Sequence, residues 1–250
     1  IFYVEGGPGE SGIDKIRQDA YVDYFLNLRQ FGDVILFDQR GTGATHPRLD
    51  CLERRDLPLD QAMTRENALP ILRDKSWQCF QFWLMHQDIY SYMVEFSADD
   101  IDALREALGY EQIILHGGSY GSHLSLATIR RYPDRIARAF LGLIEGMDDT
   151  IKLPSNIQAQ MVKISEKIAA DPAWNTRIPD FLALVGDVLA KLEREPLRVP
   201  VRDRVSGAVL DVTLGKFDLQ FFTATGLGSD QFISRLPQRY AAMADGDFSW

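Results

Sequence analysis

The stretch Gln112 to Ser122 reads QIILHGGSYGS, and it joins an apolar run to a serine that glycines flank on both sides. The run Ile113–Leu115 has the aliphatic, β-branched side chains of a buried strand. The segment 123–132, HLSLATIRRY, has the spacing of a helix. A buried strand has no structural use for a glycine-caged serine, so this junction needs a chemical explanation.

Residues Gly117 to Gly121 match G-x-S-x-G, in which a serine occupies a sharp strand-to-helix turn. Such a turn needs the glycines because a Cβ atom there would collide with neighbouring chain. It raises the Oγ atom of Ser119 at the carboxyl edge of a sheet, and the helix aims its first amide, that of Tyr120, at a developing oxyanion. The alternative is a glycine-rich turn without chemistry. A second run, Gly6 to Gly9, favours catalysis because it can supply another backbone donor.

The first 150 residues alternate short apolar runs with more polar, helix-period segments, which indicates a parallel sheet covered by helices. The runs are IFYV (1–4), DVILFD (33–38), QIILHG (112–117) and IARAFLGLI (136–144). The segment 97–108 predicts a helix capped by Ser97. The stretch 48–92 has an irregular texture, which we interpret as an insertion with short helices.

After residue 150 the strand rhythm stops and helical periodicity takes over. Alternation around Ser206 and Gly207 predicts a small hairpin within this region. The change of composition predicts two domains, a core over 1–150 that carries Ser119 and a mostly helical cap over 151–250.

The composition is that of a globular chain: 250 residues, 46% hydrophobic, with a formal net charge of −9. This charge argues against a nucleic-acid partner, which needs a basic face. No apolar run approaches the roughly 20 residues of a membrane span, and no signal peptide is visible. The sequence indicates no metal or organic cofactor and carries no sign of an oligomeric state. Cys51 and Cys79 fit neither a zinc site nor a CxxC pair, which leaves a loop-closing disulfide or two free thiols.

Three motifs carry a family resemblance: EGGPGESG (5–12), FDQRGTGAT (37–45) and HGGSYGSHLSLATIRRYP (116–133). In this order they resemble the α/β-hydrolase group of proline iminopeptidases and tripeptidyl aminopeptidases. The resemblance implies an α/β-hydrolase fold with Ser119 as nucleophile, Gly7 and Tyr120 as oxyanion-hole amides, and a structural turn at Asp38. The region 221–249 resembles the helical cap of that group.

The cysteines resemble those in the insertion of the secreted tripeptidyl aminopeptidase branch. The resemblance therefore favours a disulfide between Cys51 and Cys79 and a secreted or periplasmic location, with a cytoplasmic location as the alternative.

This chain departs from the family pattern at two places. Glu5 stands where the family often has histidine, which changes local charge without touching the backbone amides. The family's catalytic acid and histidine follow the cap, whereas this sequence ends at Trp250 within cap-like helices. We therefore expect a fragment whose sheet is incomplete at both ends, with the triad acid and histidine beyond residue 250. The four histidines within the chain are interpreted as structural or solvated.

The segment LGLIEGMDD (141–149) resembles the family's strand end that carries an acid followed by glycine. Glu145 is our candidate anchor for a substrate ammonium, because a partly desolvated carboxylate binds such a group with a charge-assisted bond. The alternative is a solvated carboxylate at a strand end.

These observations predict a serine hydrolase that releases residues or short peptides from peptide N-termini through an acyl-enzyme on Ser119. A carboxylic-ester hydrolase would use the same machinery, so a small ester is the alternative substrate. The third alternative, a catalytically incomplete fragment or binding module, rests on the histidine that the chain lacks.

Overall fold

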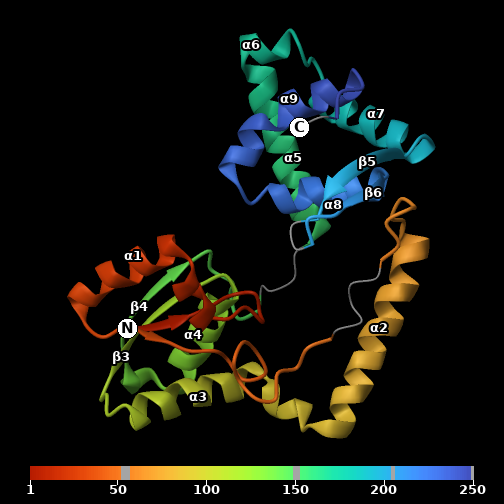
Figure 1. Ribbon diagram of the computed structural model, residues 1–250. Coiled ribbons are helices and arrows are strands. Elements are labelled where there is room, and N and C mark those ends of the chain that lie inside the picture. Colours follow the sequence, from red (N-terminus) through yellow and green to blue (C-terminus); the bar gives the residue numbers. More distant parts are fainter. Residues whose placement is uncertain (52–56, 149–152, 204–205, 249–250) are drawn as a thin grey trace. The chain divides into compact units, whose positions relative to one another are not determined.

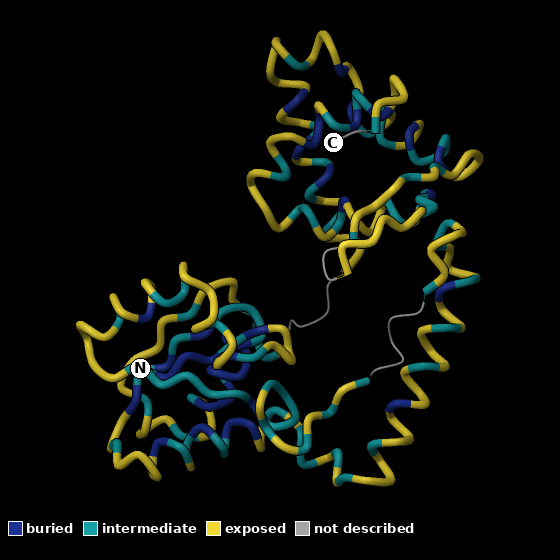
Figure 2. The backbone as a smooth tube through the Cα atoms, in the orientation of Figure 1, coloured by how far each residue is buried: buried dark blue, intermediate teal, exposed yellow. Residues whose placement is uncertain are grey.

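The computed structural model describes residues 1–51, 57–148, 153–203 and 206–248. The chain divides into two compact units, one made of Ile1–Leu52 and Trp77–Ile151 and the other of Glu53–Ser76 and Lys152–Trp250. Each unit buries its own hydrophobic cluster (Figure 2). The stretch 53–76 thus belongs to the second unit. The change of composition near residue 150 gives no sign of this assignment.

A parallel four-stranded sheet with the order β2-β1-β3-β4 forms the centre of the first unit (Figure 1). Its strands are β1 (Phe2–Val4), β2 (Ile35–Leu36), β3 (Ile113–Gly118) and β4 (Ile136–Gly142). The apolar runs of the sequence therefore form the strands, which confirms the predicted parallel sheet. Val4 pairs with Gly117 and Gly118 with Gly142, so the carboxyl ends of β1, β3 and β4 meet at one edge.

Helices cover both faces of this sheet, with α1 on one face and α3 and α4 on the other (Figure 1). The helical segments of the unit are η1 (Ile13–Arg17), α1 (Asp19–Leu28), η2 (Arg29–Phe31), η4 (Ile89–Tyr92), α3 (Val94–Ala107), α4 (Tyr120–Arg131) and η5 (Pro133–Arg135). Leu115 of β3, Ile101 of α3 and Leu124 of α4 pack in one cluster and are fully buried. Each such side chain contributes about 1.5–3 kcal/mol, so this cluster holds α4 and its first turn against the strands.

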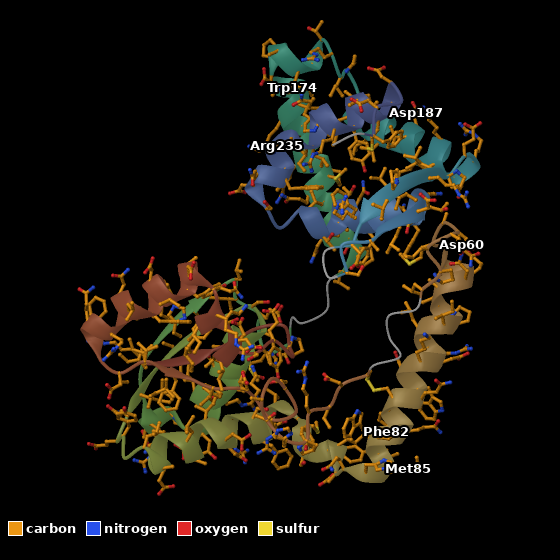
Figure 3. All side chains as sticks on the ribbon, viewed as in Figure 1. Asp60, Phe82, Met85, Trp174, Asp187 and Arg235 are labelled. Atoms are coloured by element: carbon orange, nitrogen blue, oxygen red, sulfur yellow. A yellow bond between two sulfur atoms is a disulfide. The ribbon has the colours of Figure 1, made fainter. Side chains whose placement is uncertain are left out.

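Two helices differ from the expectation. Helix α3 begins at Val94 after Met93, so Ser97 lies inside the helix and does not cap it. The stretch interpreted as short helices contains one long helix, α2 (Arg65–His86). Its apolar side chains, including Phe82 and Met85, are largely exposed (Figure 3). Because they do not form one buried face, the sequence lacks the helical period of apolar residues that would predict a long helix.

The second unit is mostly helical, as predicted, and contains an antiparallel hairpin. Its elements after residue 152 are α5 (Pro154–Ala170), α6 (Pro172–Asn175), α7 (Phe181–Arg194), β5 (Leu197–Arg202), β6 (Val209–Leu214), α8 (Lys216–Gly226) and α9 (Asp230–Ala244). Gly207 has φ +71° in the hairpin loop, as glycine at such a turn readily does. Phe181, Leu236 and Tyr240 are almost fully buried in its core. Among the described helices, none combines the length and the apolar character that crossing a bilayer requires.

The turn after β2 is held together by the carboxylate of Asp38. Its Oδ1 accepts hydrogen bonds from Ser11 Oγ at 2.8 Å and from the Ile13 amide at 3.2 Å, and its Oδ2 accepts one from the Ala44 amide at 2.8 Å. Burial acts to raise the pKa of Asp38, but these hydrogen bonds outweigh it and hold the pKa below its ordinary value. The family resemblance implied such a structural role for this turn.

We expect Asp38→Asn to lower the free energy of unfolding by about 1–3 kcal/mol, because an amide cannot accept all of these bonds. Since folding lowers the Asp38 pKa, its contribution is present above the unfolded pKa of about 3.9 and is lost as pH falls through the folded pKa. Urea titrations from pH 7 to pH 3 should show the difference between the two proteins shrinking with acid. Asp14→Asn, at an exposed surface pair with Arg17, is the control and should change little. A difference independent of pH would contradict this account.

Candidate active site

Ser119 lies between the last residue of β3 and the first residue of α4, with φ 54° and ψ −130°. Positive φ is uncommon for a residue with a Cβ atom and costs free energy unless the surroundings impose it. The Ser119 amide donates to the Gly142 carbonyl at 3.2 Å, which fixes the turn to the end of β4. The structure thus has the sharp strand-to-helix turn that the sequence pattern predicts, with a half-buried serine at its apex.

The flanking glycines are required by close backbone approach. A Cβ atom on Gly117 would lie 2.4 Å from the Gly121 carbonyl oxygen, and one on Gly121 would lie 2.0 Å from the Val4 carbonyl oxygen. Both separations are far below van der Waals contact. By contrast, a Cβ on Gly118 would have only the Gly142 oxygen nearby, at 3.8 Å. The spacing of the motif therefore follows from where the turn touches β1 and itself.

The loop after β1 packs against this turn. A Cβ atom on Gly6 would lie 3.4 Å from Ser119 Cβ and 3.8 Å from the Tyr120 nitrogen, so the Gly6 backbone is close to both. Gly7 follows with φ +113°, a conformation that favours glycine. Tyr120 is the first residue of α4, and its amide has no acceptor within the helix. Two backbone segments that carry amide donors thus lie beside the serine.

Glu5 braces this loop where the family often has histidine. Its carboxylate accepts from the Gly6 amide at 2.7 Å and from the Tyr3 hydroxyl at 3.0 Å, and it pairs with Lys15 at 3.3 Å. Burial and the nearby Glu5 charge raise the pKa of Tyr3, so the hydroxyl stays protonated and donates. Glu5 thus joins the loop backbone to Tyr3 and Lys15 through three polar contacts.

Glu145 lies beside the serine, three residues after the end of β4. The Ser119 Oγ atom donates to Glu145 Oε1 at 3.4 Å, a long and therefore weak hydrogen bond. The Glu145 amide donates to the Ser122 hydroxyl at 2.8 Å, which fixes its backbone to α4. Glu145 is singled out through the family resemblance of the segment 141–149, whereas no sequence pattern points to Ser122.

The histidines of the chain have other partners. His116 contacts the Tyr24 hydroxyl through Nε2 on the α1 face, and burial lowers its pKa. His123 donates from Nδ1 to the Gly146 carbonyl at 3.1 Å. His86 bonds the Phe82 carbonyl at 2.6 Å, and His46 lines a separate cavity. All four lie in the described part of the chain, and none is hydrogen-bonded to Ser119, in line with the structural or solvated roles expected.

Comparison with known proteins identifies the family of this chain. A model of the α/β-hydrolase fold matches residues 1–238. The chain belongs to the α/β-hydrolase fold family. This match, together with the parallel sheet and its helices, confirms the fold predicted from the sequence.

The relatives of this α/β-hydrolase chain include peptidases. It is 27% identical to serine protease Hip1 of Mycobacterium tuberculosis over 184 residues, which cover 70% of this chain and 35% of that protein. It is 23% identical to a tripeptidyl aminopeptidase of Streptomyces coelicolor over 216 residues, 80% of this chain and 38% of that protein. It is 32% identical to a probable proline iminopeptidase of Leptolyngbya boryana over 144 residues, 58% of this chain and 30% of that protein.

These names confirm the resemblance to proline iminopeptidases and tripeptidyl aminopeptidases. The chain spans 28% to 38% of the length of the curated relatives that it matches.

In this α/β-hydrolase chain, Cys51 and Cys79 are joined by a disulfide with Cα atoms 5.5 Å apart (Figure 3). Cys79 belongs to α2, and the bond ties that helix to the chain that follows the Asp38 turn. The cysteines are 28 residues apart, and closing a loop of that length contributes about 3.6 kcal/mol in the chain-entropy model.

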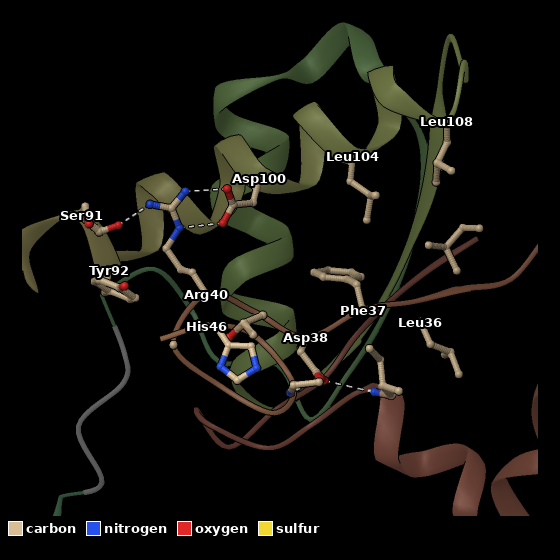
Figure 4. Close-up of a pocket in the computed structure, with 15 residues that line it drawn as sticks. Leu36, Phe37, Asp38, Arg40, His46, Ser91, Tyr92, Asp100, Leu104 and Leu108 are labelled. Atoms are coloured by element: carbon tan, nitrogen blue, oxygen red, sulfur yellow. Dashed lines mark hydrogen bonds and ion pairs between the residues drawn. The ribbon is translucent and has the colours of Figure 1, made fainter. Parts of the chain in front are cut away.

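A cavity of about 670 Å³ lies next to β2, η4 and α3, and Ser119 does not line it (Figure 4). The Arg40 guanidinium in its wall donates to both carboxylate oxygens of Asp100, at 2.5 and 2.6 Å, and to the Ser91 carbonyl. Because Arg40 and Asp38 are already engaged in this way, they stabilise the loop after β2. No group of three or more His, Cys, Asp or Glu side chains suited to a metal ion occurs among the described residues.

Proposed function

We propose that the protein is a serine aminopeptidase that cleaves peptide substrates from their free N-termini through an acyl-enzyme on Ser119. The observation that carries this proposal is the Ser119 turn, with positive φ on a residue that has a Cβ atom and close backbone approach at both flanking glycines. Strain of this kind clusters at functional sites, where surrounding contacts impose it. The peptidase names among the relatives support the same reaction class.

In the proposed reaction the Ser119 Oγ attacks the scissile carbonyl carbon while a general base takes its proton. The carbonyl oxygen becomes an oxyanion that accepts hydrogen bonds from the Gly7 and Tyr120 amides. The carbon–nitrogen bond then breaks, the leaving amine takes the proton, and an ester to Ser119 remains. Water, deprotonated by the same base, hydrolyses this ester and restores the serine. The identity of this base and of its acid partner stays a prediction.

Glu145 is proposed to bind the substrate ammonium. Its carboxylate lies at the serine and is half-buried, so a bound ammonium would be partly shielded from water. A charge-assisted bond is stronger in such surroundings than at an open surface. An ester hydrolase has no use for this charge, so the acid beside the nucleophile favours the peptidase over the esterase.

The experiment that tests this function uses Glu145→Gln in the full-length protein. We expect kcat/KM on peptides with a free N-terminus to fall roughly ten- to hundredfold, since a hydrogen bond to a charged group contributes about 1.5–3 kcal/mol. N-acetylated peptides and simple esters should lose little because they carry no ammonium.

Glu95→Gln is the matched control for this test. It removes a negative charge from an exposed carboxylate whose electrostatic field acts on Tyr120. The variant should leave kcat/KM on both substrate classes unchanged. Equal losses on free and blocked substrates would reject the anchor. Preference of the unmodified protein for esters would favour the esterase.

Residues 151–250 are proposed to serve as the cap, and the protein is proposed to work in a secreted or periplasmic compartment. The disulfide between Cys51 and Cys79 supports that location, because such bonds persist in oxidising compartments.

A further inference from the structure

The peptide group between Glu5 and Gly6 has both of its polar atoms hydrogen-bonded. The Gly6 amide donates to Glu5 Oε1 at 2.7 Å, and the Glu5 carbonyl accepts from Gln39 Nε2 at 2.9 Å. Gly6 and Gln39 are buried, so water competes little for either bond. The two bonds therefore fix this peptide plane in the loop beside Ser119.

The next amide, that of Gly7, is the one proposed as an oxyanion donor. Gly7 is exposed, and in the described part of the chain its amide has no hydrogen-bond acceptor. Rotation about the backbone bonds of Gly6 could turn this amide, because glycine permits many conformations. Close packing limits that rotation, since a Cβ atom on Gly6 would lie 3.0 Å from the Gly118 oxygen. The direction of the Gly7 amide thus depends on the peptide plane before it.

The Glu5 carboxylate is itself held at its other oxygen. Oε2 accepts from the Tyr3 hydroxyl at 3.0 Å and pairs with Lys15 Nζ at 3.3 Å. The Glu5 and Lys15 side chains are only 12% and 14% exposed, so solvent screens this ion pair weakly. The hydrogen bond from Lys15 to Glu10 raises the pKa of Lys15, so its ammonium stays charged at neutral pH. One carboxylate oxygen is thus anchored while the other holds the loop amide.

We propose that Glu5 is a positioning residue for catalysis, because its carboxylate orients the Gly7 amide by way of the Gly6 amide. The inference rests on the proposed function in two respects: an acyl-enzyme forms on Ser119, and Gly7 donates to the oxyanion. It adds the side chain that controls this donor, at a position where the family often has histidine. It does not depend on the substrate being a peptide, because an ester forms the same kind of oxyanion.

Loss of the carboxylate acts on the transition state more than on substrate binding. A buried amide without an acceptor is costly, so the Gly6 peptide would turn toward another partner. The Gly7 amide would turn with it, away from the place where the oxyanion forms. Because this donor acts mainly once the oxyanion develops, kcat should fall while KM changes little.

The test compares Glu5→Met with the unmodified full-length protein. We expect kcat to fall roughly ten- to hundredfold, on free-amine peptides and on p-nitrophenyl esters alike, with KM within about threefold. An aminoacyl trifluoromethyl ketone forms an oxyanion on the serine, so its inhibition constant should rise by the factor by which kcat falls. Glu5→Gln should keep at least about a third of kcat, because its side-chain oxygen can still accept from the Gly6 amide.

Glu10→Met is the matched control. Glu10 pairs with the same lysine, at 2.7 Å from Lys15 Nζ, but among the described residues its carboxylate accepts from no loop amide. The Glu10 side chain is 60% exposed, and its loss should leave kcat within about twofold. Equal losses in both glutamate variants, or a rise in KM in place of the fall in kcat, would overturn the inference and leave the proposed function standing.

Circular dichroism melts show whether each variant folds. If Glu5→Met does not melt cooperatively, Lys15→Met decides, because it keeps the bond to Gly6 and removes the ion pair that anchors Oε2. We expect its kcat to fall about three- to tenfold with KM unchanged, and an unchanged kcat would overturn the inference. Turnover that survives in Ser119→Ala would overturn the proposed function and the inference with it.

Discussion

Ser119→Ala is expected to lower kcat of the full-length protein by about 10⁴- to 10⁶-fold, because an acyl-enzyme cannot form without the hydroxyl. Residual turnover should come from the oxyanion-hole amides and from binding alone, which act without the nucleophile. The measurement is steady-state hydrolysis of a free-amine peptide p-nitroanilide, together with labelling by a fluorophosphonate that reacts with activated serines. Labelling should disappear in the variant.

The fold should tolerate this substitution, so the loss is chemical. Alanine keeps the Cβ atom, and the backbone at φ 54° carries the same strain for either residue. The hydroxyl's hydrogen bond to Glu145, at 3.4 Å, is too long to stabilise the unit much. The thermal midpoint should therefore move by no more than about 2 °C. Retained activity at an unchanged midpoint would show that another residue is the nucleophile.

Local patterns predicted the parts of the fold that local physics determines. The strands follow from short apolar runs, and the turn at Ser119 follows from glycines whose missing Cβ atoms are required by nearby backbone. The long helix α2 could not be predicted in this way. Its apolar residues do not form one buried face, so no helical period appears in the sequence.

In the candidate site, too, only the residues that local backbone geometry determines could be predicted from the sequence. The Ser119 turn and the glycine-rich loop after β1 have sequence patterns of their own, because backbone geometry imposes residue types on them. The approach of Glu145 to Ser119 joins positions 26 residues apart, and the Ser122 bond to Glu145 joins positions 23 apart. A serine in a helix and a glutamate after a strand are common, so neither residue type signals these contacts. Only the pairing of β3 with β4, which brings both strand ends to one edge, makes these contacts visible.

The steric requirement at the serine turn leads to the second large effect. We expect Gly121→Ala to lower the free energy of unfolding by more than about 4 kcal/mol, or to prevent folding. The added Cβ would lie 2.0 Å from the Val4 oxygen, 2.9 Å from the Val4 carbonyl carbon and 3.1 Å from the Glu5 oxygen. All three are backbone atoms at the end of β1, where Val4 is fully buried. They cannot rotate away as a side chain would, so α4 must move off the sheet.

Gly118→Ala provides the control within the same motif. Its Cβ would meet only the Gly142 oxygen at 3.8 Å, which is ordinary contact, and its φ lies outside the left-handed range. Its thermal midpoint should stay within about 2 °C of the unmodified protein, whereas that of Gly121→Ala should fall by about 10 °C or more. Circular dichroism melts of the two variants make the comparison. Similar melts would mean that α4 can shift away from β1 at little cost. The close approach would then no longer explain why glycine is needed two residues after the serine.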